Sequence, residues 1–161
     1  MQLSSKIVPL NEGGHKVDLS VTECGIRVSW LLLWAKTVEQ KLGPDATTAD
    51  VCAQHVIHIT SSRKCRYVDI IEPGNVGPPQ YFLSHTWSWR FQTLAEVVAQ
   101  RLQQEQDAFV WLDICAINQN KYEDKGELQQ DDISHLADVV RKTKSTLFCL
   151  DEEGKTLTRI W

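Results

Sequence analysis

Tyr81-Phe-Leu-Ser-His-Thr-Trp87 and Phe109-Val-Trp-Leu-Asp-Ile114 set the architecture of this chain. Each is an apolar run of strand length that leads into polar and aromatic residues. The segment from Trp89 to Gln106 between them is long enough for one helix, and strand, helix and strand in this order predict a βαβ unit with parallel strands. Ligands of open α/β sheets bind beyond the carboxyl ends of the strands. The polar residues after both strands are therefore expected on one rim of the sheet.

Composition sets broad limits on the class of protein. The 161 residues suit one domain, and 42% hydrophobic residues are enough for a substantial core. A net charge of −4 gives no electrostatic basis for binding nucleic acid. The apolar run Val28 to Ala35 is shorter than the roughly 20 residues that span a bilayer, and the first residues lack the apolar stretch of a signal peptide. We expect a soluble, cytoplasmic protein without a membrane span.

The cysteines point to the same compartment. There are five, an odd number, and none forms a Cys-x-x-Cys pair. Two of them fall within predicted strands. This pattern indicates buried thiols in a reducing environment.

The first part of the chain, residues 1–79, is predicted to be a leader that precedes the compact module. Residues 1–18 are polar and suggest a loose lead-in, whereas apolar residues recur at helical spacing from Val21 to Leu42. A short helix capped near Thr47 or Thr48 follows, and then a possible strand from Cys65 to Ile71. The turn-rich stretch 72–79 marks the end of the leader.

Residues 80–161 are predicted to form the α/β module. The helix after the first strand places four apolar residues on one face: Phe91, Leu94, Val98 and Leu102. A long loop, 118–132, is expected above the rim, since long loops in compact domains tend to be functional. A second amphipathic helix with apolar residues between Ile133 and Val140 follows, and Ser145 to Leu150 is predicted to be a third buried strand.

These residues carry a resemblance to a known family. Phe82-Leu-Ser-His-Thr-Trp87 followed by Val110-Trp-Leu-Asp-Ile-Cys-Ala-Ile-Asn-Gln119 resembles the heterokaryon-incompatibility (HET) domain pattern, in which an LSHxW strand precedes a WxDxxCINQ strand. HET domains are similar in fold to Toll/interleukin receptor (TIR) domains. The leader motifs, such as Thr47-Thr-Ala-Asp-Val-Cys52, are most similar to algal and protist members of that group. The resemblance covers residues 80–161 well and the leader only vaguely.

The resemblance implies a TIR-like (flavodoxin-like) parallel sheet flanked by helices and, for many TIR relatives, cleavage of NAD at the nicotinamide glycosidic bond. The catalytic residue of those enzymes is a glutamate in a WCxxE motif. Trp161 matches the tryptophan of that motif, and the glutamate is absent from this sequence. Glu152 and Glu153 lie on the preceding turn, where a shift of about 1 Å can cost some 100-fold in rate. We expect a C-terminally incomplete module with an open sheet edge. The sequence identifies no catalytic residue.

The predicted nucleotide contacts come from the rim. Ser84 and His85 stand where the first strand passes into the helix, a position whose free N–H groups suit a phosphate, and Arg90 can add a bidentate contact. The alternative for the first two residues is structural, with His85 bonded to a neighbouring strand end and Ser84 capping the turn. Trp87 and Trp89 can stack on a base or on nicotinamide, or anchor packing.

Two further residues complete the predicted set. Asp113 follows an apolar run, so its carboxylate needs hydrogen bonds. It binds ribose hydroxyls, or it holds the His85 imidazole or the loop at Asn118. Asn118 is interpreted first as a loop-fixing residue and second as a ligand contact. Trp111 is predicted to be core because helices cover both faces of such a strand.

A metal site is the weaker interpretation of one further pattern. Cysteine and histidine suit zinc, and Cys52, His55, His58 and Cys65 lie close together in the sequence. On one continuous helix, however, positions 52 and 58 diverge by more than a right angle. We therefore predict no metal and no bound cofactor, with NAD as a possible substrate.

Two functional hypotheses follow. The first is a nucleotide-binding, NAD-consuming signalling domain of innate immunity or cell-death control. The second is a homotypic interaction module in which loop 118–132 and exposed helices mediate self-association, while the rim residues stiffen the fold. A larger protein assembly is the expected partner in both.

Overall fold

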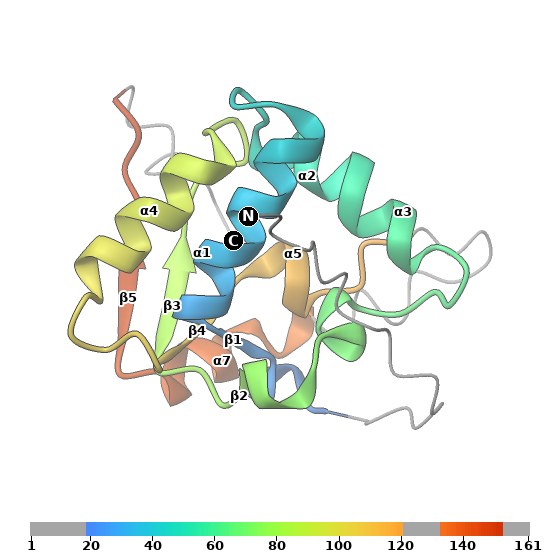
Figure 1. The fold of residues 1–161 in the computed structure, drawn as a ribbon. Helices are drawn as coiled ribbons and strands as arrows, with labels where there is room; N and C mark the ends of the chain where they lie inside the picture. Colours follow the sequence, from blue (N-terminus) through green and yellow to red (C-terminus); the bar gives the residue numbers. More distant parts are fainter. Residues whose placement is uncertain (1–18, 121–132, 153–161) are drawn as a thin grey trace.

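The computed structural model describes residues 19–120 and 133–152. The element order is η1 (Val21–Glu23), β1 (Gly25–Arg27), α1 (Val28–Leu42), α2 (Thr48–Val51), η2 (Cys52–Val56), α3 (Ile57–Thr60), η3 (Tyr67–Ile70), η4 (Pro73–Asn75), β2 (Val76–Gly77), β3 (Tyr81–Ser84), α4 (Phe91–Arg101), β4 (Phe109–Trp111), α5 (Asp113–Ala116), α7 (Leu136–Lys142) and β5 (Ser145–Phe148). The predicted α/β class, with helices flanking an open sheet, is confirmed (Figure 1).

The sheet has five strands in the order β2-β1-β4-β3-β5. The βαβ unit is confirmed, because β3 and β4 run parallel with Tyr81 opposite Val110 and Phe82 opposite Trp111. β5 also runs parallel to β3. β1 and β2 add two antiparallel pairings, so the sheet is mixed rather than wholly parallel. The carboxyl ends of β3 and β4 therefore meet, as the sequence predicts.

Helices cover the two faces of the sheet unequally. α1 and α4 lie side by side in front of the strands in Figure 1, and α7 lies behind them with η1. All four residues of the predicted α4 stripe are buried: Phe91, Leu94, Val98 and Leu102. Trp111 is fully buried, its ring stacks on Phe82 at 5.0 Å between centroids, and its indole N–H donates to the Val21 carbonyl. The prediction that Trp111 is core is confirmed.

The leader differs from its prediction in two places. The predicted helix 21–42 begins only at Val28, because Gly25 to Arg27 pair with both β2 and β4. The predicted strand 65–71 is wrong. Tyr67–Ile70 forms a 3₁₀ helix, η3, which begins where the Asp69 carboxylate accepts hydrogen bonds from the Arg66 N–H and guanidinium. These hydrogen bonds satisfy the Arg66 N–H and pair the two charged side chains, so the segment needs no neighbouring strand.

The short helix after α1 begins as predicted. Thr47 is its N-cap: its hydroxyl accepts from the Asp50 N–H, and the Asp50 carboxylate accepts from the Thr47 N–H. This reciprocal capping box satisfies two backbone donors that the helix start would otherwise leave unpaired.

Two predictions in the last part of the chain need correction. The helix α7 exists, but it buries Val139, while Ile133 and Val140 are exposed. The strand β5 also exists, but it is an edge strand and not a buried one, because Phe148 is 63% exposed. Most of the predicted loop 118–132 lies outside the described residues, as do Glu153 and Trp161.

A glycine explains how the leader joins the sheet. A Cβ atom at Gly25 would lie 2.6 Å from the Gly77 carbonyl oxygen and 3.0 Å from the Phe109 Cβ, so only glycine allows β1 to fit between β2 and β4.

Gly25→Ala is therefore expected to lower the free energy of unfolding by about 1–3 kcal/mol, since the backbone carbonyl must move. Urea denaturation measures the change. The control is Gly74→Ala, where a Cβ atom meets nothing within 4 Å. Equal stability of the two variants would contradict the close β1–β2 approach.

Candidate functional site

A buried carboxylate connects the ends of the two central strands. Asp113 is the first residue of α5, two positions after β4, and it is 2% exposed. Its Oδ1 accepts from the Ile114 N–H at 2.8 Å and lies 3.0 Å from His85 Nε2, and its Oδ2 accepts from the Trp87 indole N–H at 2.8 Å. We call Asp113, His85 and Trp87 the rim cluster.

The rim cluster has the bonding that burial of a carboxylate requires. His85 has no exposed surface, and its Nδ1 faces the Thr86 carbonyl at 3.4 Å. Three donors converge on one carboxylate, so its charge is compensated inside the fold. Of the alternatives stated for Asp113, the structure places its carboxylate on the His85 imidazole. Trp87 is half-buried, with its indole nitrogen turned inward onto the same carboxylate.

The loop after β3 is held by several elements. The Ala49 N–H donates to the Trp87 carbonyl and the Thr48 N–H donates to the Trp89 carbonyl, each at 3.0 Å. On the other side, the Cys149 N–H donates to the Ser84 carbonyl at 2.8 Å. The N–H groups at the start of α2 therefore bind this loop, and the loop joins the leader to the α/β module.

Two of the predicted phosphate contacts lie at different depths. Ser84 ends β3 and is buried. Arg90 is the N-cap residue of α4 and is exposed, and its guanidinium forms an ion pair with Asp45 at 2.6 Å. The Phe91 N–H, at the start of α4, donates to the Ala46 carbonyl. The structure does not bring Ser84 and Arg90 together at one surface.

Asn118 fixes the chain beyond α5. Its amide N–H donates to the Lys64 carbonyl at 2.8 Å, and its Oδ1 accepts from the Asn120 backbone N–H at 3.0 Å. Asn120, which the sequence analysis did not single out, donates to the Cys65 carbonyl and to the Thr60 hydroxyl. The only sequence signal was the Asx spacing in Asn118-Gln-Asn120, which is typical of turns.

A second buried polar cluster surrounds His55. Its Nε2 accepts the indole N–H of Trp34 at 3.2 Å and lies 3.0 Å from the Tyr67 hydroxyl, and the Trp34 and Tyr67 rings stack at 4.9 Å. Burial lowers the pKa of His55 to about 4, assisted by the nearby charge of Lys41. From the sequence, a zinc site that includes His55 is only the weaker interpretation, and no metal is predicted. In residues 19–120 and 133–152, no group of three or more histidine, cysteine or acidic side chains is placed to bind a metal.

His55 predicts a specific dependence of stability on pH. Its ordinary pKa of 6.5 applies in the unfolded chain, so between about pH 6.5 and 4 the unfolded state binds the extra proton. The stability is therefore full above pH 6.5 and falls as the pH is lowered, by about 2–3 kcal/mol at pH 4. His55→Gln should lose less stability than wild type over this range in urea titrations. The control, His58→Gln, replaces an exposed histidine on the same helical segment. Equal pH profiles for wild type and His55→Gln would contradict this account.

None of the five cysteines forms a disulfide in the described structure, and four of them are buried. Burial raises the pKa of Cys52 to about 12 and that of Cys149 to about 11, and it raises the pKa of Cys115 well above its ordinary value. A nucleophilic cysteine needs a lowered pKa, so these three thiols serve packing.

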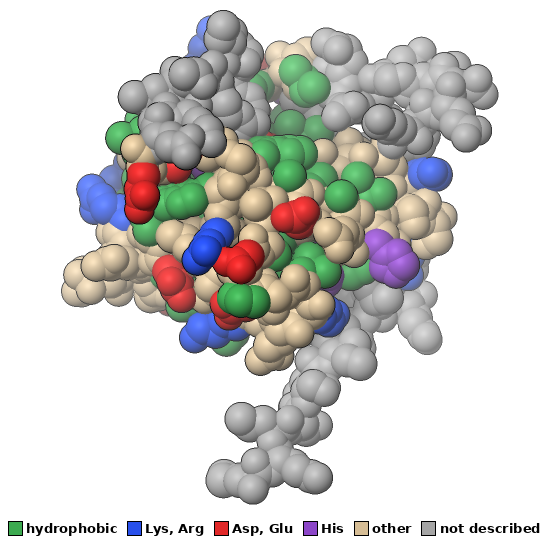
Figure 2. All heavy atoms as spheres, turned by 90° about the horizontal axis from the view of Figure 1, so that it is seen from above, with side chains coloured by type: hydrophobic (Ala, Val, Ile, Leu, Met, Phe, Trp, Pro, Cys, Tyr) green, Lys and Arg blue, Asp and Glu red, His purple; other side chains and the backbone are tan. Residues whose placement is uncertain are grey.

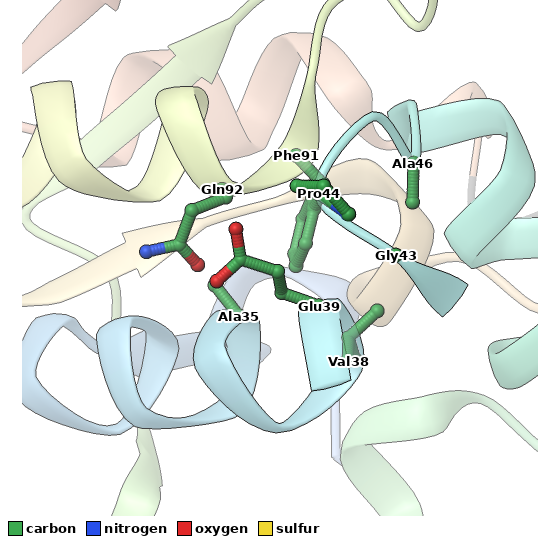
Figure 3. A pocket seen from close by; sticks show the side chains of 8 residues that line it. All are labelled: Ala35, Val38, Glu39, Gly43, Pro44, Ala46, Phe91 and Gln92. Atoms are coloured by element: carbon green, nitrogen blue, oxygen red, sulfur yellow. The ribbon is translucent and has the colours of Figure 1, made fainter. Parts of the chain in front are cut away.

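Within the part of the chain that the structure describes, a small surface hollow lies between α1 and α4. Figure 3 shows Glu39 and Gln92 pointing toward one another across it, with Phe91 and Pro44 beside them. It is a shallow hollow with no enclosed volume, whereas typical ligand sites enclose roughly 300–1,000 Å³. None of its lining residues belongs to the predicted nucleotide contacts. Figure 2 looks onto the end to which β3 points, where acidic and basic side chains are interspersed with apolar ones.

Comparison of the chain with protein-family models, with curated proteins and with solved structures finds no match. Among the described residues, no helix combines the length and the apolar character needed to cross a bilayer.

Proposed function

We propose that this chain is a cytoplasmic signalling module of the TIR/HET-like type that works by homotypic association. One observation carries the proposal. In the described part of the chain, β5 bonds only to β3, and it presents Phe148 at 63% and, just beyond its end, Leu150 at 51% exposure. An edge strand with unpaired backbone groups and exposed apolar side chains is a template for pairing with another chain.

The bonding of the rim cluster also favours the homotypic interaction hypothesis over the nucleotide hypothesis. Asp113 and His85 are buried and bonded to one another, and Asn118 holds the Lys64 carbonyl. These side chains serve as internal supports, which is the role that the interaction hypothesis assigns to them. The elements they join, β3, β4 and the leader, form the platform beside β5.

Sedimentation velocity over a wide range of protein concentration tests the proposal. We expect reversible association, and we expect Phe148→Glu to weaken it at least about 30-fold, as for a central interface residue. The matched control is Leu33→Glu on α1, where the side chain is 65% exposed, and it should associate as wild type does. A chain that stays monomeric at every concentration would refute the proposed function.

Binding or cleavage of NAD is the second candidate, favoured by the half-buried Trp87 indole at the carboxyl ends of parallel strands. The interaction hypothesis predicts that NAD neither raises the unfolding temperature nor yields nicotinamide. A rise in the unfolding temperature that grows with NAD concentration would favour the nucleotide hypothesis instead, because ligands that bind only the native state stabilise it.

A further inference from the structure

The charged residues that flank β5 make this segment complementary in charge to a second copy of itself. Lys142 and Lys144 stand at the amino end of the strand, and Asp151 and Glu152 stand beyond its carboxyl end. Side chains alternate between the two faces of a strand. Thr146 and Phe148 therefore lie on one face of β5, and Leu150 continues the same spacing two residues beyond the end of the strand, between a basic end and an acidic end.

We propose that two copies of the chain join β5 to β5 in antiparallel orientation across a two-fold axis at Phe148, forming one continuous sheet. This inference rests on the proposed function and specifies its geometry. Antiparallel pairing places each basic end beside the partner's acidic end, whereas parallel pairing would place like charges together. The two-fold contact is closed, so it gives a dimer and not a fibre.

The register follows from the apolar residues. With Phe148 opposite its own copy, Thr146 lies opposite Leu150 and Lys144 lies opposite Glu152. Directly opposed side chains of an antiparallel pair lie on the same face, so the two exposed Phe148 rings cover one another. The hydrogen-bonding edge of β5 that faces away from β3 pairs with its copy, which is the strand-addition mode of recognition.

The charges at the two ends can rearrange without disturbing the fold. The Lys144 side chain is 67% exposed, and it meets the Tyr81 hydroxyl at 3.3 Å and Glu105 at 3.8 Å. Glu152 is also exposed. Exposed ion pairs contribute little to folding stability, so reversing either charge should leave the monomer folded.

Mixing two charge-reversed variants tests the geometry. In the proposed register, Lys144→Glu places two acidic side chains opposite one another at both ends of the contact, and Glu152→Lys places two basic ones there. Each variant alone should dimerise roughly tenfold more weakly than wild type, because two symmetric contacts become repulsive. An equimolar mixture should regain association, since positions 144 and 152 then carry opposite charges at both ends of the mixed pair. Lys36→Glu on α1 is the control and should change nothing.

Disulfide trapping fixes the register. In a Cys65→Ser background, Thr146→Cys mixed with Leu150→Cys should cross-link into a covalent dimer under mild oxidation, because opposed Cα atoms lie about 4.5–5.5 Å apart. Each variant alone should cross-link far less.

The outcomes separate this inference from the function on which it rests. Two results would overturn the antiparallel geometry and leave homotypic association standing. The first is association that requires Phe148 but is not restored by mixing the charge-reversed variants. The second is a covalent dimer formed by either cysteine variant alone. A monomeric wild type overturns both.

Discussion

Asp113→Ala is expected to lower the free energy of unfolding by about 3–5 kcal/mol. The substitution removes the acceptor for three buried donors: the His85 imidazole, the Trp87 indole and the Ile114 N–H. Breaking a buried pair by deleting one partner costs more than the pair contributes, since the remaining groups stay buried without compensation. Urea denaturation with an unchanged m-value measures the effect.

Asp113→Asn provides the graded comparison. The amide keeps one oxygen for His85 and Ile114, but it places an NH₂ group toward the Trp87 indole N–H, so a loss of about 1–3 kcal/mol is expected. Asp107→Ala removes an exposed carboxylate paired with Arg27 and should cost far less. A loss for Asp113→Ala as small as that for Asp107→Ala would show that the rim cluster does not support the fold.

Trp111→Ala is the second large effect, with an expected loss of about 3–5 kcal/mol from a fully buried aromatic side chain. The substitution leaves a cavity beside Phe82 and removes the indole hydrogen bond to the Val21 carbonyl, which keeps its bond from the Cys24 N–H. Because Val21 belongs to the leader, this contact joins the leader to the central strand. Thermal unfolding followed by circular dichroism measures the change.

Trp111→Phe separates the two contributions. It retains a ring against Phe82 but loses the N–H donor to the Val21 carbonyl, so we expect a loss of about 1–2 kcal/mol. If Trp111→Phe were as damaging as Trp111→Ala, the hydrogen bond and not the ring packing would dominate at this position.

Sequence pattern was sufficient to predict the elements whose stabilising contacts lie within the element or in its neighbours along the chain. The α4 stripe follows helical periodicity, and all of its apolar residues are buried. The Thr47 and Asp50 capping box starts α2, and two apolar runs separated by one helix form the parallel pair β3 and β4. The stripe and the capping box depend on neighbours within a few turns of chain, and the parallel pair depends on the single helix length between its strands; a sequence displays both directly.

Sequence pattern gave wrong secondary structure or burial at three places, most clearly where a segment pairs with strands far away in the sequence. Gly25 to Arg27 fit a helical periodicity that continues into α1, yet β2 and β4 recruit them into the sheet. The predicted strand from Cys65 to Ile71 failed for a local reason, because Arg66 closes on Asp69 three residues later. Exposure of Phe148 also has no local signal, because an edge strand and a central strand have similar composition.

The amino-acid order by itself determined the α/β class, the parallel central pair and the meeting of His85 and Asp113 at one rim, since strand polarity and helix length follow from spacing. Only the tertiary structure decided that Asp113 binds His85 and Trp87, that His55 lies between Trp34 and Tyr67, and that β5 is an edge. Burial and pairing of polar groups depend on which distant segments close over them, and that choice is made by the free energy of the whole fold.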